Sequence, residues 1–222
     1  MVAPRPPGRL GGRIPPGQVV TNGWPVLHAG SIPLDLTPAN WSLEIHGEVD
    51  RPRRLSFEEL TALSQKEIEC DIHCVTSWTK LGMRWKGVPF RAIADEAKPR
   101  PGVRFAVMEC EQGFTTSLPL ATLLEDDVLI AHTVDDQPLP IEHGGPVRML
   151  VPKRYFYKSA KWLRGLKFVR TDEPGFWEVR GYSNIADPWA ETRYDVDDVK
   201  TIHRMRKSSL FRPLRSEEEP PP

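Results

Sequence analysis

The 222-residue chain has few cysteines, no excess of charge of either sign and no long apolar run. Its three cysteines, Cys70, Cys74 and Cys110, are sparse and odd in number, which argues against a disulfide framework and favours a reducing compartment. Lysine plus arginine and aspartate plus glutamate balance at 30 each, so no net field recruits nucleic acid or an anionic membrane. A membrane span is excluded, because no run of about 18 apolar residues occurs.

Two further features are missing from the sequence. There is no glycine-rich dinucleotide or phosphate-loop motif, so a nucleotide cofactor has no support. The proline- and arginine-rich start lacks the apolar segment of an export signal, and we therefore expect a cytoplasmic protein. What is abundant is proline, with 23 residues, which favours a β-rich or loop-rich fold over a helical bundle.

Local patterns indicate mixed secondary structure. Residues 41–49 alternate between apolar and polar side chains and predict a half-buried strand. Ser56 and Glu59 form a capping box, which predicts a short helix from Ser56 to about Leu63. Further strands are expected at 103–108, 128–133, 147–151 and 166–169, and short helices at 89–96 and 118–125. The sequence predicts an α+β domain over residues 19–198, with a flexible extension at 1–18 and a charged, proline-ended tail at 199–222.

The segment ECDIHCVTSW, residues 69–78, raises the question of what Cys74 does. It can be a small buried core residue, or a zinc ligand together with Cys70 and His73, although that spacing is crowded. It can also be a nucleophile, but His73 is badly placed as its base because neighbouring strand residues point to opposite faces, which leaves His143 as a base. A fourth interpretation is a thiolate that binds a redox metal within a cofactor pocket.

Two downstream motifs favour the fourth interpretation. EHGGPVRMLVP places His143 and Arg148 on either side of a Gly-Gly-Pro turn, where backbone can approach a ligand and a guanidinium can bind a phosphate. YKSAKW follows, in which Lys158, Ser159 and Lys161 offer ammonium, hydroxyl and backbone donors. Together with Cys74, these motifs are typical of a site for an anionic organic cofactor that carries a metal.

The motifs together resemble the sulfite oxidase family of molybdenum-cofactor enzymes, in particular its small stand-alone bacterial members. The resemblance covers residues 14–194 and depends on six segments in the family's order: RIPPGQVVTNGWPVLHAG, DIHCVTSWTKLGMRWKGVPF, QGFTTSLPL, EHGGPVRMLVP, YKSAKWLRGLKFV and GFWEVRGYSNIADPWAETRY. It implies a mixed, barrel-like α+β domain that binds a molybdenum–molybdopterin cofactor and acts as an oxidoreductase.

The resemblance also implies roles for particular residues. Cys74 matches the sulfur ligand of the metal, and Tyr182 matches a tyrosine that points at the metal centre. The remaining cofactor-binding positions that it implies are Asn22, Trp24, Thr115 (or its neighbour Thr116), His143, Arg148, Ser159, Ala160 and Lys161.

The chain departs from true sulfite oxidases at two arginines, whose positions read Thr21 and Thr79. We therefore expect oxygen-atom transfer on a small, neutral or weakly charged S-oxide or N-oxide, with sulfite oxidation proper or a non-catalytic cofactor carrier as alternatives. No haem domain precedes the cofactor region and no dimerisation domain fits after Tyr194, so we expect a separate cytochrome or flavoprotein as electron partner.

Overall fold

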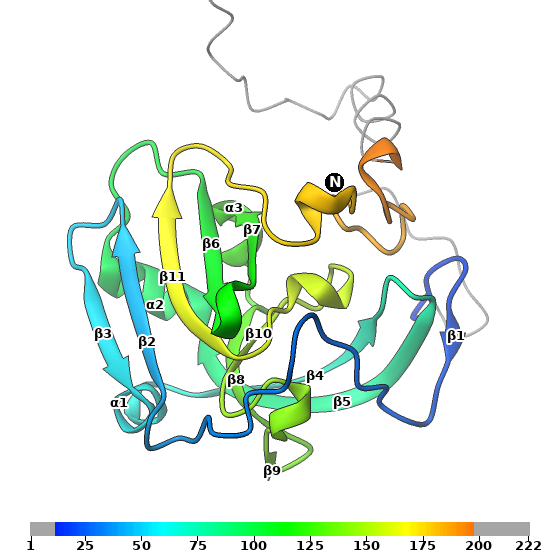
Figure 1. Cartoon of the computed structure of the whole chain (residues 1–222), viewed down its shortest axis with the longest axis horizontal. Coiled ribbons are helices and arrows are strands. Elements are labelled where there is room, and N and C mark those ends of the chain that lie inside the picture. The colour runs from blue at the N-terminus through cyan, green and yellow to red at the C-terminus, as the bar shows by residue number, and fades with distance from the viewer. Residues whose placement is uncertain (1–11, 198–222) are drawn as a thin grey trace, which may run out of the picture.

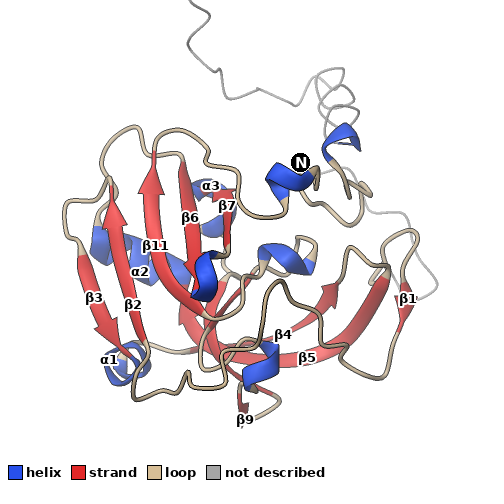
Figure 2. Ribbon diagram, in the orientation of Figure 1, coloured by secondary structure: helices blue, strands red, loops and turns tan. Residues whose placement is uncertain are grey.

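Two open β-sheets and a few short helices make up the part of the chain that the computed structural model describes, residues 12–197 (Figures 1 and 2). The first sheet has the order β1 (Val19–Val20), β5 (Trp78–Pro89), β8 (Leu129–Val134) and β10 (Arg148–Leu150), with β4 (Lys66–His73) paired to β5 and β9 (Gln137–Pro138) paired to β8. The second sheet has the order β3 (Arg53–Ser56), β2 (Ser42–Gly47), β11 (Leu163–Val169), β6 (Phe105–Cys110) and β7 (Thr115–Pro119).

Both sheets mix parallel and antiparallel pairs. In the second sheet, β11 runs parallel to β2 and antiparallel to β6. In the first, the short β1 lies parallel to the start of β5, and the other pairs are antiparallel. The helices are α1 (Phe57–Ala62), α2 (Phe90–Ala97) and α3 (Leu120–Leu123), with 3-10 turns η1 (Glu111–Gly113), η2 (Ile141–His143), η3 (Phe156–Lys158) and η4 (Glu178–Arg180).

The capping box predicted for α1 is present. The Glu59 backbone N–H donates to Ser56 Oγ at 3.2 Å, and the Ser56 N–H donates to Glu59 Oε2 at 2.7 Å. Leu55 and Leu60, which lie one position outside this box on either side, are fully buried. The helix is only six residues long, so these caps and its buried leucine contacts stabilise it more than helix propensity does.

A single main core joins the two sheets. Apolar side chains of β2 and β6 pack with Phe90 and Ile93 of α2 and with Ile130 and Met149 of the first sheet. A smaller cluster around Trp85 lies beneath the β4–β5 hairpin. Because the cores hold the inner faces of both sheets, the loops that leave the strand ends are fixed relative to one another.

The α+β fold predicted from the sequence is confirmed, and strands and helices occur at the predicted places with shifted ends. Within residues 12–197, however, neither sheet closes into a barrel. Residues 12–18 lie against the domain, since Arg13 forms an ion pair with Asp71. The predicted division at residue 18 stays a prediction, and residues 1–11 and the predicted tail at 199–222 lie outside the described residues.

Candidate active site

Cys74 lies in the turn of the long β4–β5 hairpin, which carries it to the edge of the first sheet. The turn is closed by two backbone hydrogen bonds, from Cys74 N–H to the Trp78 carbonyl (2.8 Å) and from Ser77 N–H to the Cys74 carbonyl (3.0 Å). Gln18 Nε2 donates to the same Cys74 carbonyl at 3.0 Å, and the sulfur lies 3.1 Å from the Thr76 hydroxyl. The thiol position is therefore fixed by the hairpin and by the N-terminal segment together.

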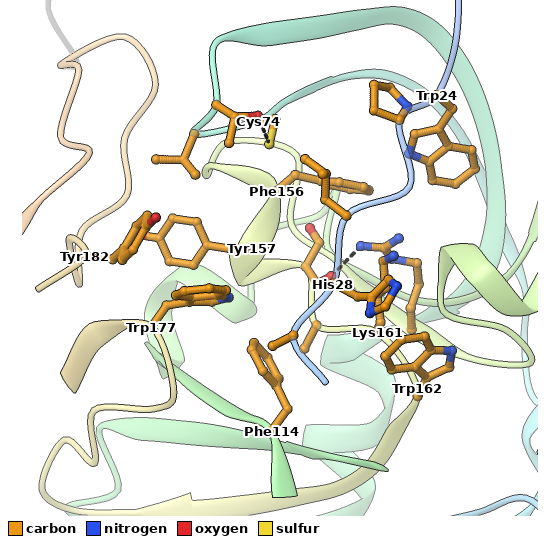
Figure 3. Close-up of a pocket in the computed structure, with 18 of the residues that line it drawn as sticks. Trp24, His28, Cys74, Phe114, Phe156, Tyr157, Lys161, Trp162, Trp177 and Tyr182 are labelled. Carbon is orange, nitrogen blue, oxygen red and sulfur yellow. Dashed lines mark hydrogen bonds between the residues drawn. The ribbon is translucent and has the colours of Figure 1, made fainter. Parts of the chain in front are cut away.

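A cavity of about 290 Å³ opens beside this turn (Figure 3). Three segments contribute to its walls: residues 24–29, residues 74–78, and residues 156–162, which comprise η3 and the loop that leads to β11. Single side chains from Phe114, Arg148, Trp177 and Tyr182 complete it. Segments that are distant in the sequence thus meet at the place where loops of both sheets face one another.

Arg148, at the start of β10, is 1% exposed and lies in the wall of this cavity. Its guanidinium donates to the backbone carbonyls of His143 (2.6 Å), Ser159 and Met149, and it lies 4.1 Å from the centre of the Phe156 ring. Burial lowers the pKa of this guanidinium to about 9. Among the described residues no carboxylate forms an ion pair with it, so the wall carries a buried cation that an anion can neutralise.

Lys161 adds a second cation to the same wall. Its ammonium donates to the Glu142 carbonyl at 2.7 Å, an uncharged acceptor. Burial, and then the positive charge of Arg148, lower the pKa of this lysine to about 7. Before it, the Ser159 hydroxyl accepts from the Val151 N–H at 2.9 Å, which holds the loop of residues 159–161 against the strand that follows Arg148.

His143 lies next to this wall but does not line the cavity. Its ring stacks on Trp24, with centroids 3.6 Å apart and planes only 4° from parallel. Burial lowers the pKa of His143 to about 4, so the imidazole is neutral, and its buried Nδ1 has no hydrogen-bond partner among the described residues. The turn after it requires glycine, because a Cβ at Gly145 would lie 2.1 Å from the Leu139 carbonyl oxygen.

The remaining wall is aromatic. Trp177 and Tyr182 flank η4, with ring centroids 5.0 Å apart, and Tyr182 also packs against Tyr157 at 5.7 Å. In Figure 3, these three rings lie on the side of the cavity opposite Trp24 and Lys161. The backbone that leads to them lies close to β7, since a Cβ at Gly175 would lie 2.2 Å from the Thr115 carbonyl oxygen.

The structure brings together most of the residues that the sequence indicates. Those that line the cavity are Trp24, Cys74, Arg148, Ser159, Ala160, Lys161 and Tyr182. Three others do not line it: Asn22, His143 and Thr115. The Asn22 carbonyl accepts from Lys80, and the Thr115 carbonyl accepts from the Phe176 N–H at 2.8 Å. Binding roles for all these residues stay predictions.

Several residues of the site were not singled out from the sequence. Gln18 and Thr76 contact Cys74, and the rings of Phe114, Phe156 and Trp177 form much of the apolar surface. The dense aromatic spacing of RYFYKSAKW, residues 154–162, is a signal for one of these rings, that of Phe156. Gln18 and Trp177 carry no local signal, because only tertiary packing brings Gln18 to Cys74 and Trp177 to the cavity.

Other interpretations of the cysteines find little support. Within residues 12–197, no group of three or more histidine, cysteine or acidic side chains is placed to hold a metal ion, which counts against a zinc site at Cys70, His73 and Cys74. Burial raises the pKa values of the Cys70 and Cys110 thiols, as expected of core residues. In the same part of the chain, no helix is both long and apolar enough to cross a membrane.

Comparison with known proteins decides the family. The oxidoreductase molybdopterin binding domain family matches residues 29–177, a stretch that contains Cys74, Arg148 and the loop of residues 159–161. The chain belongs to this family. It is a molybdopterin-binding oxidoreductase.

Two curated relatives and one solved structure illustrate what the chain is similar to. An uncharacterized oxidoreductase of Bacillus subtilis, YuiH, is 43% identical over 84% of this chain and 94% of its own length. The protein-methionine-sulfoxide reductase catalytic subunit MsrP of Campylobacter jejuni is 25% identical over 68% of this chain, which spans only 56% of that protein. The sulfane dehydrogenase SoxCD of Paracoccus pantotrophus has the same fold, with a TM-score of 0.59 at 22% identity over 66% of this chain and 41% of its own.

The family implies a molybdenum cofactor, and the cavity fits one in its donor chemistry. A molybdopterin carries a phosphate, for which the wall offers Arg148 and Lys161 without a competing carboxylate ion pair among the described residues. The cofactor metal is bound by a soft sulfur, for which the same cavity offers Cys74. The 159–161 loop and Trp24 add polar and aromatic surface to the same cavity.

Proposed function

We propose that this chain catalyses oxygen-atom transfer on a small, neutral or weakly charged S-oxide or N-oxide, with Cys74 as the protein ligand of molybdenum. The charge distribution of the cavity carries the proposal. Its two cations, Arg148 and Lys161, lie on the wall suited to the cofactor phosphate, and the wall of Tyr157, Trp177 and Tyr182 is uncharged. An aromatic wall favours a neutral, partly apolar substrate over a dianion.

The positions at which sulfite oxidases carry arginines support the same assignment. Thr79 is fully buried, with its hydroxyl 2.9 Å from His73 Nδ1 and donating to Gln18 at 3.3 Å. Thr21 pairs through its backbone N–H with the Thr79 carbonyl. Neither supplies a cation, and each missing charge-assisted hydrogen bond removes about 1.5–3 kcal/mol of oxyanion binding.

The residues around the cavity have distinct roles in this proposal. When bound, the molybdenum cofactor would supply the two-electron redox chemistry for oxygen-atom transfer. Arg148 and Lys161 bind the phosphate, and the 159–161 loop orients the pterin through its backbone. The hairpin and Gln18 hold the Cys74 sulfur at a fixed place. The Tyr182 hydroxyl donates a hydrogen bond or a proton to the substrate oxygen, and the surrounding rings exclude water.

The electron partner belongs to the proposal as well. We assign the supply of electrons to a separate cytochrome or flavoprotein, because the described residues form no second cofactor domain. MsrP is itself named as a catalytic subunit, which supports the idea of a second component. The cytoplasmic location stays a prediction.

Steady-state kinetics with molybdenum-replete protein test the proposal. With a reduced dye as electron donor, a panel of small S-oxides and N-oxides should be reduced with kcat/KM at least tenfold above sulfite oxidation with a cytochrome acceptor. Faster sulfite turnover would assign sulfite oxidation proper instead. Bound molybdopterin with no Mo(V) signal on partial reduction would indicate a cofactor carrier.

A further inference from the structure

Lys158 precedes the cofactor loop, yet its side chain turns away from the cavity and is completely buried. Its ammonium donates to the Ser117 carbonyl of β7 at 3.0 Å, to Asn184 Oδ1 at 3.0 Å and to the carboxylate of Glu178 in η4. One charged group thus contacts three segments of the chain. Two of these segments flank the aromatic wall, because Glu178 directly follows Trp177 and Asn184 lies two residues after Tyr182.

The partner carboxylate is almost as deeply buried. Glu178 is 9% exposed, and besides Lys158 its Oε1 accepts from the hydroxyl of Thr116. Asn184 in turn donates to Asp172, which also accepts from the Ser117 hydroxyl. The polar groups therefore form a connected network between β7 and the segment of residues 172–184, directly behind the rings that face the cavity.

A buried ion pair of this kind adds little net stability, since the cost of removing both charges from water offsets their attraction. Its geometric effect is different, because moving either charge away from the other leaves an uncompensated charge in the interior. The network consequently resists displacement of η4 relative to η3. Trp177 and Tyr182 move with η4, and the cofactor loop of residues 159–161 continues directly from Lys158.

We propose that Lys158 is a positioning residue that holds the Trp177–Tyr182 wall at a fixed place relative to the cofactor loop. If the proposed function holds, this wall faces the substrate, and the ion pair then sets the size of the substrate space before substrate binds. In this proposal Lys158 acts on the wall through Glu178 and Asn184, and its own side chain does not line the cavity.

The test replaces both charges at once, so that neither is left unpaired. The double variant Lys158→Met with Glu178→Leu retains apolar volume and should fold. The matched control is Lys153→Met, which removes an ammonium that pairs with Glu125 and Asp127 at the surface. Hydrogen exchange of the cofactor-free protein is measured by mass spectrometry. Amides of residues 175–184 should exchange at least tenfold faster in the double variant than in the wild type. Amides of β2 in the double variant, and amides of residues 175–184 in Lys153→Met, should exchange at the wild-type rate.

A second readout uses the molybdenum-loaded enzyme. KM for a small S-oxide should rise at least fivefold in the double variant, and this factor should exceed the factor by which kcat falls. Molybdenum occupancy should stay near the wild-type value. Unchanged exchange in residues 175–184 overturns the proposal, whatever substrate the enzyme prefers, because that readout needs neither cofactor nor substrate. The proposal is also overturned if molybdenum occupancy falls while hydrogen exchange of residues 175–184 stays at the wild-type rate, since Lys158 would then hold only the cofactor loop.

If the double variant does not fold, Thr116→Val tests the same network with a smaller structural perturbation. This change keeps the ion pair and the side-chain shape but removes the hydroxyl that donates to Glu178. Exchange in residues 175–184 should rise severalfold and KM should increase without loss of molybdenum. Wild-type values for both measurements in Thr116→Val would contradict the proposal.

Discussion

At the scale of single residues, Arg148 shows how a buried cation can define a site. All three of its nitrogens donate to backbone carbonyls, so the guanidinium is held by neutral acceptors and keeps its charge available. Burial alone lowers its pKa to about 9, which still leaves it protonated at neutral pH. A cation kept in this way is complementary to an anionic ligand more than to any group of the chain itself.

Replacing Arg148 by methionine should therefore lower cofactor affinity much more than stability. The loss of one charge-assisted contact with a phosphate, about 1.5–3 kcal/mol, corresponds to roughly tenfold to hundredfold weaker binding. Molybdenum and pterin content per chain measures the effect. Arg100→Met, which removes an exposed arginine paired with Asp50, is the matched control and should leave occupancy unchanged. Full occupancy in Arg148→Met would show that this residue does not hold the phosphate.

Individual residues are also what the sequence predicts best in this protein. Cys74, Arg148 and the loop of residues 159–161 could be predicted, because short motifs with characteristic spacing carry them, and the structure places them around one cavity. Thr76 and Gln18 could not be predicted. Their contacts with Cys74 depend on the geometry of one turn and on a segment 56 residues away.

At the scale of elements, the capping box of α1 illustrates a local rule that determines local structure. Both reciprocal hydrogen bonds predicted from Ser56 and Glu59 are present.

The β4–β5 hairpin was harder to predict, although it carries Cys74. A register shift between Cys70 and Ile72 interrupts the two-residue alternation, and charged side chains along both strands face solvent. The sequence pattern of this hairpin is therefore weak.

Because α1 lies away from the cavity, its cap separates effects on stability from effects on the site. Ser56→Ala should lower the free energy of unfolding by about 1 kcal/mol, since one backbone N–H of the first turn loses its acceptor. Chemical denaturation measures this loss, and Ser42→Ala on the neighbouring strand is a comparison outside the cap. Cofactor content and turnover should stay at wild-type values in Ser56→Ala. A fall in occupancy would mean that the second sheet communicates with the site more strongly than its contacts indicate.

At the scale of the whole molecule, the site forms where the loops of two sheets converge, and no local pattern predicts this. The six motifs of the family indicated which residues matter, but not that Tyr182 and Trp177 would pack with Tyr157 into one uncharged wall. That wall depends on the path of residues 171–186 over β7. Only long-range packing, including the close approach of Gly175 to Thr115, determines that path.

The buried cations of the cavity, which form no ion pair within residues 12–197, should also affect the stability of the whole molecule. Burial lowers the pKa of Lys161 from its usual 10.5 to about 7, so the unfolded chain binds more protons than the folded protein between these pH values. The stability cost of Lys161 is thus full below pH 7 and disappears as the pH rises towards 10.5. Wild-type cofactor-free protein should gain stability relative to Lys161→Met over this range.

Denaturation of the two proteins at several pH values between 6 and 10 checks this sign. Loading the cofactor should make the free energy of unfolding of the wild type depend less on pH, because a bound phosphate favours the protonated Lys161 ammonium and raises its pKa. Parallel curves for wild type and Lys161→Met in the cofactor-free state would mean that Lys161 is better solvated than the structure indicates. Lys153→Met serves here as the surface control.

The claim on which the rest depends is that the Cys74 sulfur binds the metal. X-ray absorption at the molybdenum edge, compared between loaded wild type and Cys74→Ser, tests it directly. The number of sulfur neighbours of molybdenum should fall by one in the variant, with pterin still bound and the fold intact, whereas Cys70→Ala should give the wild-type spectrum. Identical sulfur coordination in wild type and Cys74→Ser would contradict the account.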